Sequence, residues 1–326
     1  MFKFCIKRMA SAVPLILLLP LLTLLLMQLA PGNYFDSLRM NPQISPDTIE
    51  KYAARYHLDE PVIVQYSYWV KNLLHFDLGY SFAYQQQVTD LLKSRMLNTL
   101  LLTVTSFIFA WGLAIPCGLI AGLKPSGKFD RILSIISYGG LSVPGFFLCL
   151  ILLFAAAQTG TIPLGGIRSL GYAELSIAGK IMDIGSHMFI PVAVLSLGSF
   201  CYLFRIMRAQ TIEISRKEFV LFLKACNVPK LKIIFRHILR NSVNPMITMF
   251  GLELPVLFSG SALVEIFTGW PGLGQMMLYA ARAQDMFLVL GNMVMIAVLL
   301  VLGSFVADIL LVLTDPRIRF SGGAKQ

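Results

Sequence analysis

Charged residues are scarce in this chain. They make up 13% of its 326 residues, whereas soluble domains carry about 25%. Apolar residues make up 56%, and several apolar runs reach about 20 residues, the length that crosses a hydrocarbon core of about 30 Å. The composition therefore excludes an ordinary soluble domain and predicts an all-α protein that crosses a membrane several times.

Cysteine pairs and the motifs of common catalytic sites are also missing. The five cysteines show neither C-x-x-C spacing nor a disulfide framework, the four histidines lie far apart, and neither H-E-x-x-H nor G-x-S-x-G occurs. The sequence predicts no catalytic residue, no metal ligand and no cofactor on this chain, so we expect that it is not an enzyme.

A phosphate-binding loop is approached but not completed between Gly122 and Phe129. The spacing of the two glycines and Lys128 fits G-x-x-x-x-G-K-[ST], but Phe129 stands where that loop carries the hydroxyl residue that binds magnesium, and no strand precedes the segment. We therefore expect the chain to have no ATP site of its own.

Basic residues supply most of the charge that is present, and the net charge is +10. They lie in short clusters beside apolar runs, without the aromatic–basic interleaving typical of nucleic-acid binding, so they indicate membrane topology and lipid contact and no nucleic-acid partner. Of the 27 Lys and Arg residues, 18 fall on segments predicted to be cytoplasmic. This distribution predicts that both termini are cytoplasmic.

Six apolar segments predict six transmembrane helices and set the domain boundaries. Residues 1–30 are the cytoplasmic N-terminus and first helix, 31–95 a small external subdomain, 96–314 a five-helix core, and 315–326 a cytoplasmic tail. A cleavable signal peptide is the alternative for the first helix, but its apolar run is too long and no A-x-A site follows. The predicted spans are residues 10–30, 97–122, 131–157, 187–208, 245–266 and 288–313.

Aromatic residues mark one part of the external subdomain. Tyr66, Tyr68 and Trp69 stand beside apolar residues in a segment too short to span a membrane. The pattern predicts an amphipathic element at the membrane surface, with Tyr and Trp at headgroup level.

The polar segment 209–244 lies between two predicted spans and is rich in Lys and Arg. Asn227 can take the left-handed conformation that ends a helix, and Pro229 suits the first turn of the next one. We therefore predict two short cytoplasmic helices joined by a tight corner, an arrangement that fits docking of another protein. The residues predicted to form this docking corner are Phe219, Leu223, Lys224, Ala225, Cys226, Asn227, Val228, Pro229 and Lys230.

The helix after Pro229 carries two stripes. One is basic and predicts a solvated or supporting face, and the other is apolar and predicts contact with the ends of the spans. The basic stripe consists of Lys232, Arg236 and Arg240, and the apolar stripe of Leu231, Ile234 and Ile238.

Glu253 lies well inside the fifth predicted span, where an ionisable side chain is costly. Pro255 follows at a position where the helix could kink. Two interpretations stay open for Glu253: a polar group that lines a translocation path with Pro255, or a residue that pairs with a neighbouring helix.

Motifs along nearly the full length of the sequence resemble those of a known family. The segment from Phe219 through Lys224–Asn227 and Arg236–Asn241 to Pro245 is similar to the cytoplasmic "EAA" coupling loop of ABC importer permeases, especially those for di- and oligopeptides and nickel. The other matching motifs, in chain order, are Ala30–Gly32, Tyr56–Pro61, Gln65–Tyr66, Asp77–Gly79, Ser81, Leu141–Pro144, Glu265–Phe267, Trp270–Gly274 and Asp315–Arg319.

The resemblance implies a type I importer permease with six spans in a bacterial inner membrane. It implies four partners: a second similar permease, two cytoplasmic ATPases that bind ATP and Mg on their own chains, and an external substrate-binding protein. Peptides are the expected substrate, and nickel or another small solute is the alternative within the family. A passive channel is a further alternative, but a channel needs no docking corner, so the corner favours the importer.

This sequence departs from the family at three positions. Asn227 stands where the family usually has Gly, and Asn retains the left-handed option. Leu223 replaces the second Ala of the signature, which implies a matched groove on the partner ATPase. Glu253 stands where Gln or an apolar residue is expected, which leaves the substrate open.

Overall fold

The computed structural model describes residues 2–29, 54 and 60–314, and most of them are helical. The described strands form one short antiparallel hairpin, β1 (Tyr80–Ser81) with β2 (Gln86–Gln87). The all-α prediction is confirmed. Residues 31–53 and 55–59 of the predicted external subdomain and the predicted tail, residues 315–326, lie outside the described residues.

The chain divides into two compact units. Unit 1 comprises residues 1–99 and 271–301, and unit 2 comprises residues 100–270 and 302–326.

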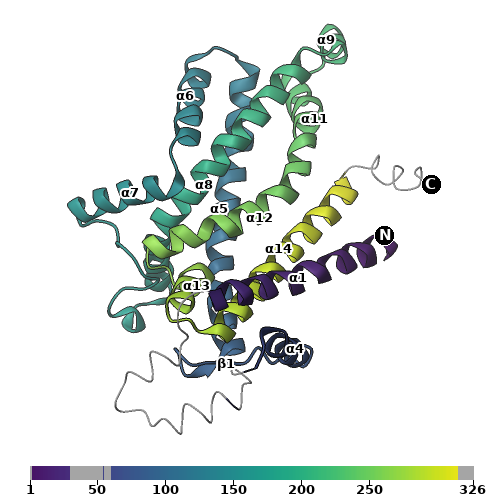
Figure 1. Cartoon of the computed structure of the whole chain (residues 1–326). Helices are drawn as coiled ribbons and strands as arrows, with labels where there is room; N and C mark the ends of the chain where they lie inside the picture. The colour runs from purple at the N-terminus through teal and green to yellow at the C-terminus, as the bar shows by residue number, and fades with distance from the viewer. Residues whose placement is uncertain (1, 30–53, 55–59, 315–326) are drawn as a thin grey trace. The chain divides into compact units, whose positions relative to one another are not determined.

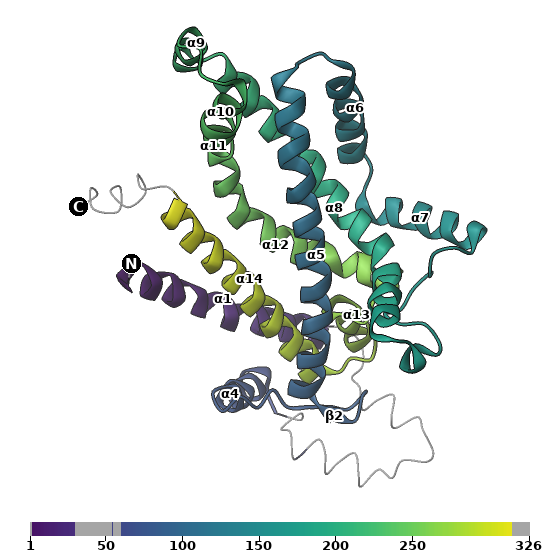
Figure 2. The same ribbon diagram turned by 180° about the vertical axis from the view of Figure 1, so that it is seen from behind.

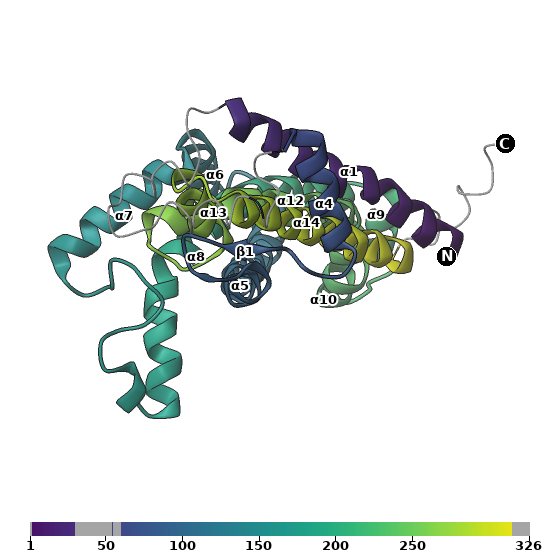
Figure 3. The same cartoon turned by 60° about the horizontal axis from the view of Figure 1, so that its bottom comes forward.

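Unit 1 contains the first helix of the chain and the elements that follow it. In Figures 1 and 3, α4 lies against α1. The Tyr66 hydroxyl of α4 donates a hydrogen bond to the backbone carbonyl of Leu17 in α1 at 2.6 Å. The described helices of unit 1 are α1 (Phe2–Leu29), α4 (Val62–Leu73), the start of α5 (Val88–Leu123), α13 (Leu273–Arg282) and the first part of α14 (Met286–Thr314).

The aromatic residues of α4 do not share one environment, contrary to the sequence-based expectation. Trp69 is buried, with 2% of its surface exposed, while Tyr68 is 43% exposed. Because the indole of Trp69 is buried by tertiary packing, α4 forms part of the core of unit 1.

Unit 2 is built around the long helix α8 (Ile177–Ser215). It packs against α6 (Lys128–Ser142), α7 (Gly145–Thr159) and α12 (Asn244–Phe267), as Figures 1 and 2 show. The hydroxyl of Ser176 caps the start of α8 by accepting the backbone N–H of Gly179 at 3.2 Å. The inward face of α8 carries fully buried side chains, among them Leu203, Phe204 and Met207.

The third predicted span is not one continuous helix. The axes of α6 and α7 differ by 105° at a break after Ser142. Val143 is extended (φ −98°, ψ 123°), the conformation that a following proline favours, and Pro144 precedes the first turn of α7. The Leu141–Pro144 motif is therefore the break itself.

The other predicted spans fall within helices α1, α5, α8, α12 and α14, except for residue 30 of the first span, which lies outside the described residues. By length and composition alone, three described helices could cross a membrane, and four if the bent α6–α7 pair counts as one span. The three helices are Val88–Leu123, Ile177–Ser215 and the part of α14 from Met286 to Val306.

Candidate functional site

The predicted docking corner is present at one end of unit 2. After α8 ends at Ser215, the chain forms α9 (Glu218–Ala225), turns, and re-enters a helix at α10 (Lys230–Lys232). Figures 1 and 2 show α9 at the extremity of this unit, near the same end as the start of α6.

Asn227 makes the turn. Its φ of 52° is left-handed, as the sequence predicts. Its N–H donates to the carbonyl of Lys224 at 3.1 Å, and the N–H of Val228 donates to the carbonyl of Leu223 at 3.1 Å. These two bonds satisfy backbone carbonyls that the end of α9 would otherwise leave open, so the corner is a closed helix cap.

The side chains of α9 divide into an inward and an outward face. Val220 is fully buried in a core cluster with Leu203 and Phe204, and Leu223 and Val228 pack against the same cluster. The remaining predicted corner residues are exposed: Phe219, Lys224, Ala225, Cys226, Asn227, Pro229 and Lys230. Leu223 and Val228 therefore anchor the corner, and the others are available to a partner.

Two exposed residues of α9 were missed from sequence. Leu221 is 55% and Phe222 68% exposed. The signal in the sequence was the unbroken apolar run from Phe219 to Leu223, because such a run covers all sides of an α-helix and cannot be buried on one face alone. Leu221 and Phe222 form an apolar outer face on a helix that carries Lys224.

The helix after the corner has π geometry over η2 (Ile233–Leu239). Its i→i+5 hydrogen bonds bring Ile233 and Ile238 onto one face, and both are 3% exposed. The predicted apolar stripe is therefore wrong at Leu231, which is 69% exposed, and partly right at Ile234, which is half-buried. The basic stripe residues, all exposed, are Lys232, Arg236 and Arg240.

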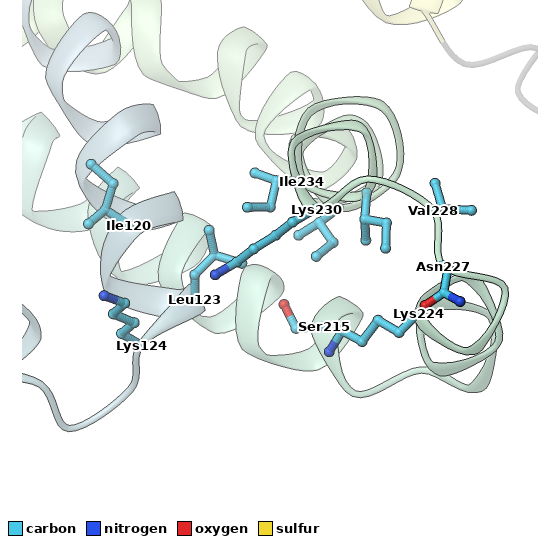
Figure 4. A pocket seen from close by; sticks show the side chains of 11 residues that line it. Ile120, Leu123, Lys124, Ser215, Lys224, Asn227, Val228, Lys230 and Ile234 are labelled. Atoms are coloured by element: carbon cyan, nitrogen blue, oxygen red, sulfur yellow. The ribbon is translucent and has the colours of Figure 1, made fainter.

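A pocket of about 700 Å³ lies beneath the corner, and Figure 4 shows it from close by. It is bounded by the end of α5, the last residue of α8, the corner and η2. Its lining residues are Ile120, Leu123, Lys124, Ser215, Lys224, Asn227, Val228, Lys230, Ile233, Ile234 and Ile238.

Glycine brings α5 close to α8 beside this pocket. A Cβ on Gly118 would lie 2.6 Å from Cβ of Met207, and one on Gly122 would lie 2.5 Å from Cβ of Thr211. The two glycines are four residues apart and so face the same side of α5. The segment Gly122–Phe129 thus has a packing role at its first glycine.

An ion pair fixes the turn between α5 and α6 on α8. Arg208 donates from Nη2 to Oδ2 of Asp130 at 2.8 Å and from Nε to Oδ1. The N–H of Ser126 also donates to Oδ2, at 2.7 Å. Asp130 is 3% exposed, so the bidentate contact with Arg208 supplies the counter-charge that its buried carboxylate needs.

Glu253 lies on α12 and is 7% exposed. Its carboxyl group forms a side-chain hydrogen bond with Ser199 of α8. Helix α12 continues through Pro255 without interruption. The structure therefore gives Glu253 a partner on a neighbouring helix and leaves its role in a path as a prediction.

Comparison with known proteins places the chain. Residues 114–320 match the family described as binding-protein-dependent transport system inner membrane component, and residues 1–103 match the N-terminal family of such components. The chain belongs to this family. It is a multi-pass membrane component of a binding-protein-dependent transport system, and the family prediction from sequence is confirmed.

Three relatives of this membrane component are similar over nearly all of it. The oligopeptide transport system permease proteins AppB of Bacillus subtilis and OppB of Haemophilus influenzae are each 33% identical over 322 residues, covering 98% of this chain and 100% of the relative. The di/tripeptide transport system permease protein DppB of Pseudomonas aeruginosa is 29% identical, covering 98% and 99%.

A solved structure of the MetNI methionine ABC transporter, in an inward-facing conformation, shares the fold of this membrane component. The TM-score is 0.52 at 19% identity, over 69% of this chain and 96% of that one. The type I ABC importer permease fold predicted from sequence is confirmed.

Proposed function

We propose that this permease conducts peptides in an ATP-driven importer and that the docking corner contacts a separate ATPase. The relatives from Bacillus, Haemophilus and Pseudomonas are named for oligopeptides or di- and tripeptides. All three relatives are named for peptides and none for nickel, which favours peptides as the substrate.

The observation that carries the coupling part is the exposed outer face of α9. Leu221 and Phe222 are apolar and exposed on a helix whose end is closed by Asn227 and anchored by Val220. Exposed apolar groups on a rigid, capped helix are typical of a surface that a protein partner covers.

The proposed mechanism assigns the chemistry to partner chains. Two cytoplasmic ATPases bind ATP and Mg, and their closure displaces α9 together with the core to which Leu223 and Val228 anchor it. A second permease completes the path, and an external binding protein delivers the peptide. Both termini are cytoplasmic in this arrangement, which the basic residues of the inner segments support.

Glu253 and Pro255 are proposed to line the path near the contact of α12 with α8. A carboxyl group buried within a span is costly and is retained where a polar substrate or a helix partner uses it. Peptides carry amide and ammonium groups that a carboxyl group can bind.

The test is the stimulation of ATP hydrolysis by peptide-loaded binding protein in the reconstituted complex. Ala225→Asp puts a charge on the outer face of α9, and Asn227→Pro is incompatible with a φ of 52° because proline fixes φ near −65°. Both variants are expected to insert but to lose stimulation and uptake.

The matched control is Ala173→Asp, which makes the same change at another exposed alanine, in the short 3₁₀ helix η1 (Tyr172–Glu174) before α8. It is expected to keep stimulation. Normal stimulation in both corner variants would refute the docking role and favour a passive channel.

A further inference from the structure

The pocket beneath the docking corner has walls of two chemical kinds. One wall is apolar and comes from α5 and η2: Ile120, Leu123, Ile233, Ile234 and Ile238. The opposite rim is polar and comes from the ends of helices, with Lys124, Ser215, Asn227, Lys224 and Lys230. A pocket with one apolar wall and one cationic rim fits an amphiphile better than a purely polar or purely apolar ligand.

The three lysines of the rim come from separate elements. Lys124 follows α5, Lys224 ends α9 and Lys230 begins α10. None of the three forms an ion pair with a carboxylate of the described residues, and none of the eleven described lining residues is acidic. The uncompensated charge therefore favours an anionic ligand.

Ser215 supplies an independent sign of a missing ligand. Its Oγ is buried and has no hydrogen-bond partner among the described residues. In Figure 4 the hydroxyl is directed into the pocket, between Leu123 and Lys224. A buried hydroxyl without a partner is destabilising, so its position is explained if it donates to a ligand oxygen.

The pocket lies where an apolar span ends. Helix α5 ends at Leu123, and Lys124 is the next residue. Ile120, one turn earlier, is 52% exposed on a helix long and apolar enough to cross a membrane. This change from apolar to basic over one turn marks the level of the lipid headgroups.

We propose that this pocket binds an anionic phospholipid, with its phosphate held by Lys124, Lys224, Lys230 and the Ser215 hydroxyl and its acyl chain along the isoleucine wall. Lysine ammonium groups and a hydroxyl donor are groups that recognise phosphate. The bound lipid bridges α5 to the docking corner, so it stiffens the segment that contacts the ATPase. Only the assignment to the cytoplasmic leaflet and this last effect rest on the proposed function.

Lipid retention by the purified full-length chain tests the proposal without any ATPase present. The protein is exchanged into micelles with equal amounts of phosphatidylglycerol and phosphatidylcholine of the same acyl chains, and the retained lipids are measured by native mass spectrometry. Wild type is expected to prefer phosphatidylglycerol, and K124Q/K224Q/K230Q is expected to lower that preference by at least about tenfold. Ser215→Ala, which leaves the charges in place, is expected to lower it by about fivefold.

The matched control K128Q/K217Q/K232Q removes three lysine charges from the described surface outside the pocket. It is expected to keep the preference of wild type. An unchanged preference in the pocket variants, or an equal fall in the control, overturns the proposal.

Two further arms separate other ligands. Displacement of phosphatidylglycerol by millimolar inorganic phosphate would identify a soluble-anion site and overturn the lipid proposal. Loss of ATPase association with unchanged lipid preference in K124Q/K224Q/K230Q would assign the lysines to an acidic protein surface instead. Failure of the docking proposal leaves the lipid result intact, because retention is measured on the chain alone.

Discussion

Ser81 donates a hydrogen bond from its hydroxyl to Oδ2 of Asp285 at 2.7 Å, although 204 residues separate them in sequence. The same oxygen accepts the N–H of Ala83 at 3.0 Å, and Oδ1 accepts the N–H of Leu288 at 3.3 Å. Asp285 is fully buried. One carboxyl group thus ties the β hairpin of unit 1 to the first turn of α14.

Replacement of Asp285 by Ala is expected to lower the free energy of unfolding by about 3 kcal/mol, because it leaves several buried donors without an acceptor. Thermal unfolding of the purified chain measures the change. The control is Asp77→Asn: Asp77 is exposed and accepts the N–H of Gly79 at 2.9 Å, and an amide oxygen can accept the same bond. Equal unfolding temperatures for wild type and Asp285→Ala would contradict the tie.

Asp285 also predicts a dependence of stability on pH. Burial raises its pKa above the ordinary value of 3.8, more than the hydrogen bonds from Ala83 and Ser81 lower it. A carboxyl group with a raised pKa stabilises the folded state fully below its ordinary pKa, and this contribution is lost as the pH rises through the raised pKa. Wild type should therefore unfold at a higher temperature than Asp285→Asn, and this difference should be largest at acidic pH and decrease as the pH rises. A difference that increases with pH would contradict a raised pKa of Asp285.

The close approach of α5 and α8 predicts opposite effects of the same substitution at two glycines. Gly122→Ala must displace Thr211 or the carbonyl of Arg208, which a Cβ would approach to 2.5 and 2.8 Å, so a loss of about 1–3 kcal/mol is expected. Gly112→Ala, on the same helix with nothing within 4 Å, is expected to be neutral or stabilising. Thermal unfolding of both variants decides, and a tolerated Gly122→Ala would show that the helices separate easily.

The Asp130–Arg208 pair predicts an asymmetric cost of removing either partner. The side chain of Arg208 is 31% exposed and that of Asp130 only 3%. Arg208→Gln leaves the buried carboxylate of Asp130 without a counter-charge and is expected to cost roughly 3 kcal/mol, whereas Asp130→Asn leaves a cation that water can reach and costs less. The double variant should be more stable than Arg208→Gln. Equal losses in the free energy of unfolding of the two single variants would contradict the difference in burial between Asp130 and Arg208.

Glu253→Gln is expected to change the affinity or range of transported peptides, because it removes a charge at the contact of α12 with α8. Uptake kinetics for peptides of several lengths measure it. The control is Ser199→Ala, which removes the hydrogen-bond partner of Glu253 but retains the carboxyl group. Unchanged kinetics in Glu253→Gln across all peptides would assign Glu253 to helix pairing alone.

The corner could be predicted from sequence because single-residue preferences decide it. Asn tolerates a positive φ and proline tolerates the first turn of a helix, and these properties do not depend on what packs around them. The helices could be predicted because apolar runs of spanning length have few other solutions.

Other features depend on packing between distant segments and could not be predicted. The hydrogen-bond register of η2 shifts from i→i+4 to i→i+5, which exposes Leu231 and buries Ile233, yet no periodicity in so short a stretch distinguishes the two. The bend after Ser142 leaves the apolar run unbroken in composition. The pocket requires residues from α5, α8, α9 and η2, which only the fold brings together.

Helix α8 has a mechanical consequence. With 39 residues it extends over roughly 58 Å and ends three residues before α9 begins. Pro191 lies inside it and removes one backbone hydrogen bond, so its elastic compliance is concentrated there. A force applied at α9 is therefore transmitted along a stiff rod as far as Pro191, where bending absorbs strain first.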